Sequence, residues 1–397
     1  MRRFFSWLPR HLARSAQRNK VAAAALLIAA ALALELSSGC GMSLASKPVA
    51  PASSARLIGY VAGWEAQRAI PAERLTAINY AFAHVGTDQR LVLDAAGADD
   101  FIAQLRGLKA RNERLKILIS IGGWGADGFS DAAASETTRQ AFAQSAAEML
   151  ERTHADGIDI DWEYPGLPGP GIKYRDEDRH NFTLLLAAIR QRFDTLAREQ
   201  HQAHFLLTAA LADGEFVAHI ELDQIHRYLD WINLMTYDFH NSLTKTTGHH
   251  SALMRSATSA ADERSIEKAV AQFRAAGVPA GKLVVGVPFY GRAFAAVGDD
   301  NHGLDQPYGK YSGEYAWPKL KADFIGKNGY ERRWDEVALE PYLWNETTHT
   351  FISYDDPQSL RLKANYVRSR GLGGIMYWEQ SQDPDGELLE VLSNALR

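Results

Sequence analysis

The fold is decided by the stretch Asp156-Gly157-Ile158-Asp159-Ile160-Asp161-Trp162-Glu163-Tyr164-Pro165. Successive side chains of a β-strand point to opposite faces, so Asp159, Asp161 and Glu163 share one face. The other face carries Ile158, Ile160 and Trp162. Such a strand fits the wall of a barrel, in which the apolar face packs beneath helices and the acids point inward, roughly 6.6 Å apart.

Three acidic side chains that point into a barrel lower the stability of the fold unless their charges are compensated. Burying like charges costs several kcal/mol unless protons are shared or partners are supplied, so core packing alone does not explain the row. Acids at alternate strand positions also suit Mg²⁺ or Ca²⁺, and a divalent metal site is therefore an alternative to catalysis. A neutral structural role is a second alternative.

Eight short apolar segments recur along the chain, and most are near-continuous, as strands buried on both faces are. They are residues 57–62, 77–83, 116–121, 157–162, 205–211, 231–237, 283–287 and 374–378. Apolar stripes at helical spacing lie between them at residues 142–150, 182–193 and 266–273, and Ser135 is the expected N-cap of the first. This alternation predicts an α/β fold, a (β/α)8 TIM barrel, with a doubly wound open sheet as the alternative.

One interval, residues 291–351, lacks a long helical pattern and is rich in Tyr, Trp and Gly. A structureless loop of that length is improbable in a compact domain. We therefore expect a small α+β insertion domain after the seventh strand, forming one wall of the site.

The first forty residues read as an export leader. Basic residues end at Lys20, and the apolar run of residues 21–34 is too short to span a bilayer but suits a signal peptide. Small residues precede Cys40, which resembles the lipidated cysteine of bacterial lipoproteins. An uncleaved anchor and cleavage without lipid are the alternatives, and in each case the body is exported. Residues 41–55 then form a tether.

Composition excludes several classes. The 397 residues contain one cysteine, which rules out an internal disulfide framework and Cys-rich metal sites. The net charge of −5 combines a leader of +5 with a body of −10. An acidic body argues against nucleic-acid binding.

The quoted stretch resembles the DxxDxDxE signature of glycoside hydrolase family 18, the chitinases. Further motifs of that family follow in order: Ser120-Ile121-Gly122-Gly123-Trp124, Met235-Thr236-Tyr237-Asp238, Tyr290-Gly291-Arg292-Ala293-Phe294, Trp334-Asp335-Glu336 with Ser353-Tyr354-Asp355-Asp356-Pro357, and Met376-Tyr377-Trp378. The resemblance implies a barrel over residues 56–290 and 352–397, interrupted by the insertion at 291–351.

For the mechanism, the resemblance implies a retaining hydrolysis in which the 2-acetamido group of the sugar is the nucleophile. Glu163 is then the acid and base, with a pKa that the charge of Asp161 raises. Asp161 orients the acetamido group, Asp159 shares a proton with Asp161, and Tyr237 donates to the acetamido carbonyl.

Substrate contacts are implied in the same way, with Trp378 as the floor beneath the sugar and Arg292 bonding sugar hydroxyls. The other expected contacts are Tyr60, Phe82, Trp124, Met235 and Asp238. Ser120, and Tyr60 as well, are expected to support the aspartates from neighbouring strands. No metal and no cofactor is implied.

The expected partner is chitin or N-acetylglucosamine oligosaccharides, bound by a monomer that meets a membrane only through a lipid on Cys40. An endo-β-N-acetylglucosaminidase acting on glycans is an alternative within enzymes. A catalytically silent sugar-binding protein is the alternative from another class, although such proteins typically lose the terminal glutamate that Glu163 retains here. Endo and exo action are both compatible with the sequence.

Overall fold

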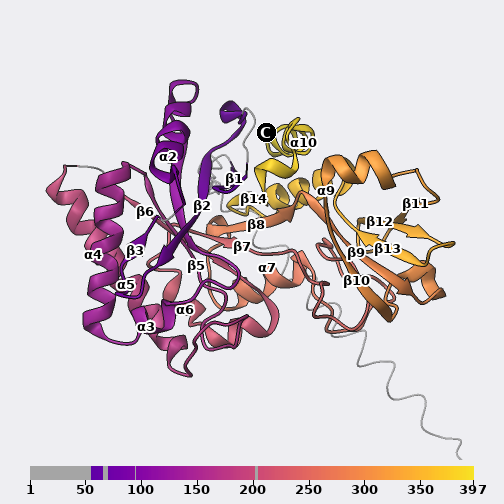
Figure 1. Cartoon of the computed structure of the whole chain (residues 1–397), viewed down its shortest axis with the longest axis horizontal. Helices are drawn as coiled ribbons and strands as arrows, with labels where there is room; N and C mark the ends of the chain where they lie inside the picture. The colour runs from indigo at the N-terminus through magenta and orange to yellow at the C-terminus, as the bar shows by residue number, and fades with distance from the viewer. Residues whose placement is uncertain (1–54, 66–69, 94, 202–203) are drawn as a thin grey trace, which may run out of the picture. The chain divides into compact units, whose positions relative to one another are not determined.

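The computed structural model describes residues 55–65, 70–93, 95–201 and 204–397. The predicted leader, Cys40 and all but the last residue of the predicted tether lie outside the described residues. The described chain alternates strands and helices, with a second sheet late in the sequence (Figure 1). Among these residues, no helix has the length and apolar composition needed to cross a bilayer.

Eight parallel strands form a closed sheet. They are β1 (Arg56–Ala62), β2 (Ala77–Val85), β4 (Lys116–Gly122), β5 (Gly157–Asp161), β6 (Leu206–Leu211), β7 (Trp231–Leu234), β8 (Leu283–Pro288) and β14 (Gly374–Trp378). Their order is β1-β14-β8-β7-β6-β5-β4-β2, and β1 also pairs with β2. A sheet whose first and last strands pair has no free edge, so the barrel prediction is confirmed and the open doubly wound sheet is excluded. The short β3 (Leu91–Val92) pairs antiparallel with β2.

β7 is shorter than the sequence predicted, because it ends at Leu234 rather than at residue 237. Beyond that point the hydroxyl of Thr236 bonds both the amide and the carbonyl of Gly286, at 3.0 and 2.7 Å. A side chain thus replaces the backbone ladder between β7 and β8. The chain is thereby free to turn just before Tyr237.

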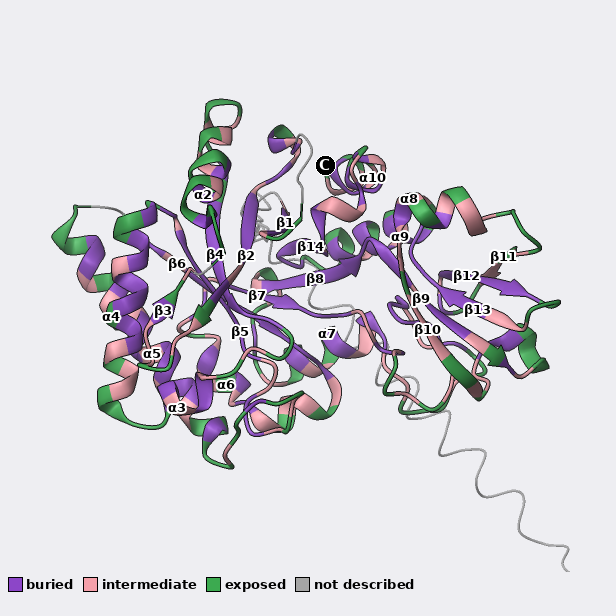
Figure 2. Ribbon diagram, in the orientation of Figure 1, coloured by how far each residue is buried: buried purple, intermediate pink, exposed green. Residues whose placement is uncertain are grey.

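Helices cover the outside of the barrel, and their inner faces are buried (Figure 2). They are α2 (Ala98–Gly107), α3 (Phe129–Ala133), α4 (Glu136–Thr153), α5 (Asp178–Glu199), α6 (Leu222–Ile225), α7 (Ile266–Ala275), α9 (Pro357–Ser369) and α10 (Glu387–Leu396). Ser135 is the N-cap of α4, where its hydroxyl accepts from the amide of Thr138 at 3.2 Å, as its position before the apolar stripe predicted.

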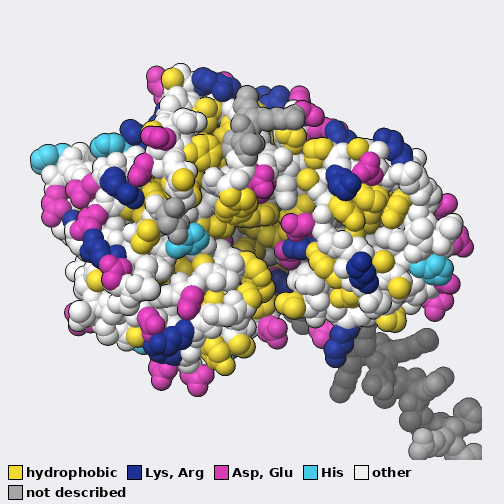
Figure 3. Space-filling model, viewed as in Figure 1, with side chains coloured by type: hydrophobic (Ala, Val, Ile, Leu, Met, Phe, Trp, Pro, Cys, Tyr) yellow, Lys and Arg dark blue, Asp and Glu magenta, His cyan; other side chains and the backbone are white. Residues whose placement is uncertain are grey.

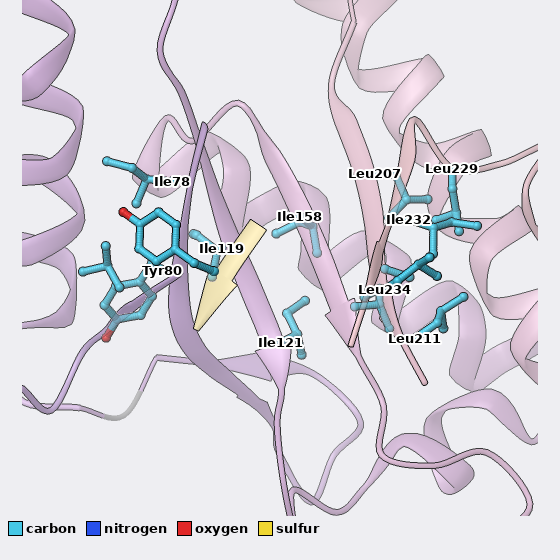
Figure 4. Close-up of a cluster of buried hydrophobic side chains, with 14 of the residues drawn as sticks. Ile78, Tyr80, Ile119, Ile121, Ile158, Leu207, Leu211, Leu229, Ile232 and Leu234 are labelled. Atoms are coloured by element: carbon cyan, nitrogen blue, oxygen red, sulfur yellow. The ribbon is translucent and has the colours of Figure 1, made fainter. Parts of the chain in front are cut away.

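The main core lies between the strands and these helices. Side chains from neighbouring strands, among them Ile119, Ile158, Leu207 and Ile232, form one buried cluster (Figure 4). Trp162 belongs to the same core and stacks on Phe129 with ring centroids 5.4 Å apart. The apolar face of the quoted strand therefore packs against helices, as its alternation predicted.

The insertion is an antiparallel sheet between β8 and β14. Its strands are β9 (Tyr290–Val297), β10 (Tyr308–Ala316), β11 (Glu331–Asp335), β12 (Glu340–Asn345) and β13 (Thr350–Ser353), in the order β10-β9-β13-β12-β11, with the short helix α8 (Trp317–Lys319) after β10. Phe294, Tyr342, Trp344 and Phe351 belong to its own small core. An insertion with its own sheet after the seventh barrel strand is thus confirmed.

Candidate active site

The expected site residues come from six strands of the barrel and from the first strand of the insertion. Because the barrel strands are parallel, their carboxyl ends meet at one end of the barrel, where the loops form a site. β5 delivers Asp159 and Asp161, and Glu163 follows its end. In the space-filling view, hydrophobic side chains gather in a hollow near the middle of the face, with charged groups along its edge (Figure 3).

Asp159 is fully buried inside the barrel and accepts four hydrogen bonds. The hydroxyls of Tyr60 and Ser120 donate to Oδ2 at 2.7 and 2.8 Å. The hydroxyl of Thr208 and the amide of Asn233 donate to Oδ1 at 2.5 and 3.1 Å. The structure therefore brings Tyr60 and Ser120 to Asp159, as expected, and adds two donors that the sequence analysis did not identify.

Asp161 lies one step further along β5 and is also buried, but its Oδ1 has no hydrogen-bond partner in the described part of the chain. Burial and the charges of Glu163 and Asp159 raise its pKa well above the ordinary value. A carboxyl group in this setting is most stable when it carries a proton.

Glu163 is half-buried just beyond the end of β5. Burial is the largest cause that raises its pKa to about 7, a hydrogen bond with the Tyr164 hydroxyl opposes the rise, and the charge of Asp238 adds to it. The pKa of Glu163 is therefore raised, as expected, with burial as the largest cause, while the repulsion between Glu163 and Asp161 acts mainly on the pKa of Asp161. The sequence alone does not show how far this carboxyl group is removed from water.

Met235 and Tyr237 follow β7 and face the interior of the barrel, where both contact its inner apolar cluster. A Cβ atom on Gly286 would lie 2.8 Å from Cε1 of Tyr237, so the glycine leaves space for this ring. Burial and the nearby carboxylates raise the pKa of Tyr237, which keeps its hydroxyl protonated and able to donate.

Asp238 and Arg292 form an ion pair that joins the barrel to the insertion. Arg292 donates from Nε to Oδ1 at 2.8 Å and from Nη2 to Oδ2 at 2.6 Å, while Tyr290 donates to Oδ1 at 2.7 Å. Burial raises the pKa of Asp238, but the neighbouring His250 and Arg292 outweigh it and hold the pKa below its usual range. Nη1 of Arg292 contacts Tyr311 and Glu314. Much of the guanidinium expected to bond sugar hydroxyls is thus committed to protein groups.

Aromatic rings line the same end of the barrel. Trp378 stacks on Phe82 at 5.7 Å and lies 5.6 Å from the ring of Tyr60. Trp64 stacks on Phe82 at 6.1 Å and is 62% exposed. Trp124 is 59% exposed and contacts the edge of Tyr164 at 6.4 Å. The exposed indole rings of Trp64 and Trp124, with the half-buried rings of Trp378 and Phe82, give this end of the barrel an apolar surface.

Two glycines of the Ser120-Ile121-Gly122-Gly123-Trp124 motif permit close packing at this end of the barrel. A Cβ atom on Gly122, whose φ is +115°, would lie 2.0 Å from the carbonyl oxygen of Asp161. A Cβ atom on Gly123 would lie 2.6 Å from the ring of Phe82. The motif therefore allows β4 to approach the acidic strand and the aromatic floor closely.

The structure adds to the site several residues that were not predicted from the sequence. Thr208 and Asn233 are polar residues in otherwise apolar strand segments, and this break in pattern was a usable signal. Tyr290 stands two residues before Arg292 and shares its face of the strand. His250 comes from the loop after β7 and contacts Asp238 at 3.6 Å, which no local pattern predicts.

Within the described ranges, no group of three or more His, Cys, Asp or Glu side chains is arranged to hold an ion. A cavity of about 470 Å³ lies at the opposite end of the barrel, beside Asp156, His154 and His204. This cavity is separate from the candidate active site, because Asp156 lies before β5 and Glu163 lies after it.

Comparisons with known proteins agree with this architecture. Chitinase A1 from Niallia circulans is 41% identical over 306 residues, which are 73% of this chain and 44% of that protein. Chitotriosidase-1 from Mus musculus is 35% identical over 345 residues, which are 82% of this chain and 73% of that protein. The chain thus spans less than half the length of the first relative.

A solved structure of a family 18 enzyme is also similar to this chain. The family 18 N-acetylglucosaminidase from Paenibacillus barengoltzii matches with a TM-score of 0.80 and 38% identity, over 86% of this chain and 99% of that one. The family model of glycosyl hydrolases family 18 matches residues 56–383. The chain therefore belongs to glycosyl hydrolases family 18.

Proposed function

We propose that this protein is a chitinase that hydrolyses the β-1,4 linkages between N-acetylglucosamine units of chitin or chito-oligosaccharides. The observation that carries the proposal is the row of acids formed by Asp159 and Asp161 on β5 and by Glu163 just beyond it, whose pKa is raised to about 7. A carboxylic acid with such a pKa is protonated in a large fraction of molecules near neutral pH. It can therefore donate a proton to a leaving group and later accept one.

In the first step, Glu163 gives its proton to the glycosidic oxygen as the bond from C1 to that oxygen breaks. The carbonyl oxygen of the substrate's own 2-acetamido group attacks C1 and forms an oxazolinium ion. In the second step the Glu163 carboxylate takes a proton from water, whose oxygen attacks C1 and reopens the ring. Two displacements at C1 give a product with retained configuration.

Asp161 and Tyr237 act on the acetamido group in this mechanism. Asp161 keeps the proton that we place on it in the free enzyme, turns toward the acetamido nitrogen, and accepts a hydrogen bond from the N–H through its unprotonated oxygen as positive charge develops there. Tyr237 donates its hydroxyl to the acetamido carbonyl, a role that its raised pKa supports. Both contacts strengthen as the ring closes, and they therefore stabilise the transition state more than the bound substrate.

The aromatic rings suit a sugar polymer. The face of an N-acetylglucosamine ring is apolar, and Trp378 offers a floor against which that face can stack. Trp64, whose ring lies 6.4 Å from that of Trp378, extends this surface, and Trp124 adds a second exposed ring; in this proposal each can stack on a further sugar. Met235, Phe82 and the Asp238–Arg292 pair complete the wall of the proposed sugar site.

The names of the relatives support hydrolysis of N-acetylglucosamine linkages and leave the mode of attack open, since one is a chitinase and another an N-acetylglucosaminidase. An endo-β-N-acetylglucosaminidase acting on branched glycans remains the enzymatic alternative. Retention of Glu163 with both aspartates argues against a silent binding protein.

Hydrolysis of a chromogenic N-acetylglucosamine oligomer tests the proposal. Glu163→Gln keeps the shape but removes the proton donor, so kcat should fall about 10²–10⁴-fold while oligomer binding persists. Glu136→Gln, an exposed substitution in the first turn of α4, is the matched control and should behave as wild type. Wild-type protein that binds the oligomer without cleaving it would reject the enzymatic proposal, and cleavage of branched glycans alone would reject chitin as substrate.

A further inference from the structure

The hydrogen bonds around Asp159 form a set with a defined geometry. Strand register places Ser120 and Thr208 directly beside Asp159, on β4 and β6 respectively. Tyr60 and Asn233 reach the same carboxylate from β1 and β7. Each carboxylate oxygen thus accepts two hydrogen bonds, one from a strand paired with β5 and one from a strand further around the barrel.

Asn233 determines which groups donate and which accept in the hydrogen bonds around Asp159. Its Nδ2 donates to Asp159 at 3.1 Å and also to the hydroxyl oxygen of Tyr60 at 3.3 Å. Since Tyr60 accepts this bond, its own proton is free to point at Asp159. A hydroxyl can reverse its role, but an amide NH₂ group cannot accept, so Asn233 fixes the direction of the network.

Asp161 has the opposite environment, although it lies on the same strand face. Burial raises the pKa of both aspartates, but at Asp159 four hydrogen bonds oppose the rise, whereas Asp161 Oδ1 has no partner in the described chain. The titratable groups that face Asp159 are Tyr60 from β1, Asp161 from β5 and Tyr237 beyond β7. The neighbouring positions on β4 and β6 carry only hydroxyls.

We propose that Thr208 and Asn233 are positioning residues which, with Tyr60 and Ser120, hold Asp159 as the ionised member of the aspartate pair and so keep the shared proton on Asp161. The inference deepens the proposed function and rests on it, because Asp161 must carry that proton before it turns toward the acetamido group. Neither residue touches sugar in this account.

Loss of a hydrogen-bond donor to Asp159 should shift the dependence of kcat/KM on pH in a direction that can be worked out. Removing one donor from Asp159 makes its charged form less stable, so the pair takes up a second proton at a higher pH. Hydrogen bonds to charged groups contribute about 1.5–3 kcal/mol, and one pH unit corresponds to about 1.4 kcal/mol. The acidic limb of the profile of kcat/KM against pH should therefore move upward by about one to two units per donor removed.

The experiment measures that profile on a chito-oligomer for Thr208→Val and Asn233→Leu, which remove the donors with little change in volume. Both variants should show the upward shift of the acidic limb and a lower kcat, with KM within about twofold of wild type because neither residue contacts sugar. Thr208→Ser keeps the hydroxyl and should restore the wild-type limb. Thr153→Val removes a buried hydroxyl that bonds the carbonyl of Met149 and is the matched control, with no shift expected.

A readout independent of hydrolysis separates this inference from the proposed function. In the full chain labelled with ¹³C at aspartate carboxyl groups, the Asp159 signal, assigned by Asp159→Asn, should titrate at higher pH in Thr208→Val than in wild type. That shift would support the inference even if wild type failed to cleave chito-oligomers, which would defeat the proposed function alone. An unmoved acidic limb and an unmoved Asp159 titration in folded variants would overturn it.

Discussion

At Glu163, opposing effects set the proton affinity of a single carboxyl group. Burial and the charge of Asp238 raise its pKa, and the hydrogen bond with Tyr164 lowers it, with a net value of about 7. Asp238 keeps its own negative charge because His250 and Arg292 lie against it. The ion pair at the junction with the insertion thus influences the proposed acid.

This value predicts the basic limb of the pH profile. Glu163 must be protonated to act as an acid, so kcat/KM should fall as pH rises through about 7, approaching tenfold per unit above it. Steady-state kinetics on a chito-oligomer between pH 4 and 9 measures the limb. A value of kcat/KM that still rises at pH 8.5 would contradict the assignment.

At the scale of elements, the acidic strand was predictable because its alternation is strict. Register with β4 and β6, however, depends on contacts between segments far apart in sequence, so the pairing of Thr208 with Asp159 could not be predicted. The same holds for the end of β7, where the side chain of Thr236 replaces the ladder. Side-chain alternation within one segment predicts which residues share a face of a strand. Which residues of neighbouring strands lie beside each other depends on how the whole barrel closes.

A buried ion cluster joins three elements near the site. Nζ of Lys363 on α9 lies 2.6 Å from both carboxylate oxygens of Asp355 and 3.0 Å from Glu340 on β12, and none of these side chains is exposed. Ser251, next to His250, accepts from the same amine at 2.8 Å. Burial and the charge of Asp355 raise the pKa of Glu340 well above its usual range, which favours its neutral form in this cluster.

Lys363→Met keeps the length of the side chain but leaves the Asp355 carboxylate buried without its cation. Breaking a buried pair in this way costs about 3–5 kcal/mol, so the free energy of unfolding in urea should fall by that amount. Lys173→Met breaks an exposed pair with Asp131 and should cost about 0–1 kcal/mol. Equal losses in the two variants would show that the cluster has no special part in stability.

At the scale of the whole molecule, the barrel supplies the acids and the insertion supplies Arg292, so the site depends on both. The sequence predicted that an insertion follows the seventh strand, because sixty residues without a long helix need a fold of their own. It could not predict that Arg292 mainly holds Asp238, since that contact joins β9 to the end of β7 across 54 positions.

The central claim is that Glu163, with the two aspartates of β5 before it, cleaves chitin with retention of configuration. Digestion of the N-acetylglucosamine hexamer, followed by mass spectrometry and by ¹H NMR of the new reducing ends, tests it directly. Wild type should give shorter oligomers whose new ends are first β-anomers, and Glu163→Gln should leave the hexamer intact. New ends that are first α-anomers, or cleavage by Glu163→Gln at the wild-type rate, would contradict the account.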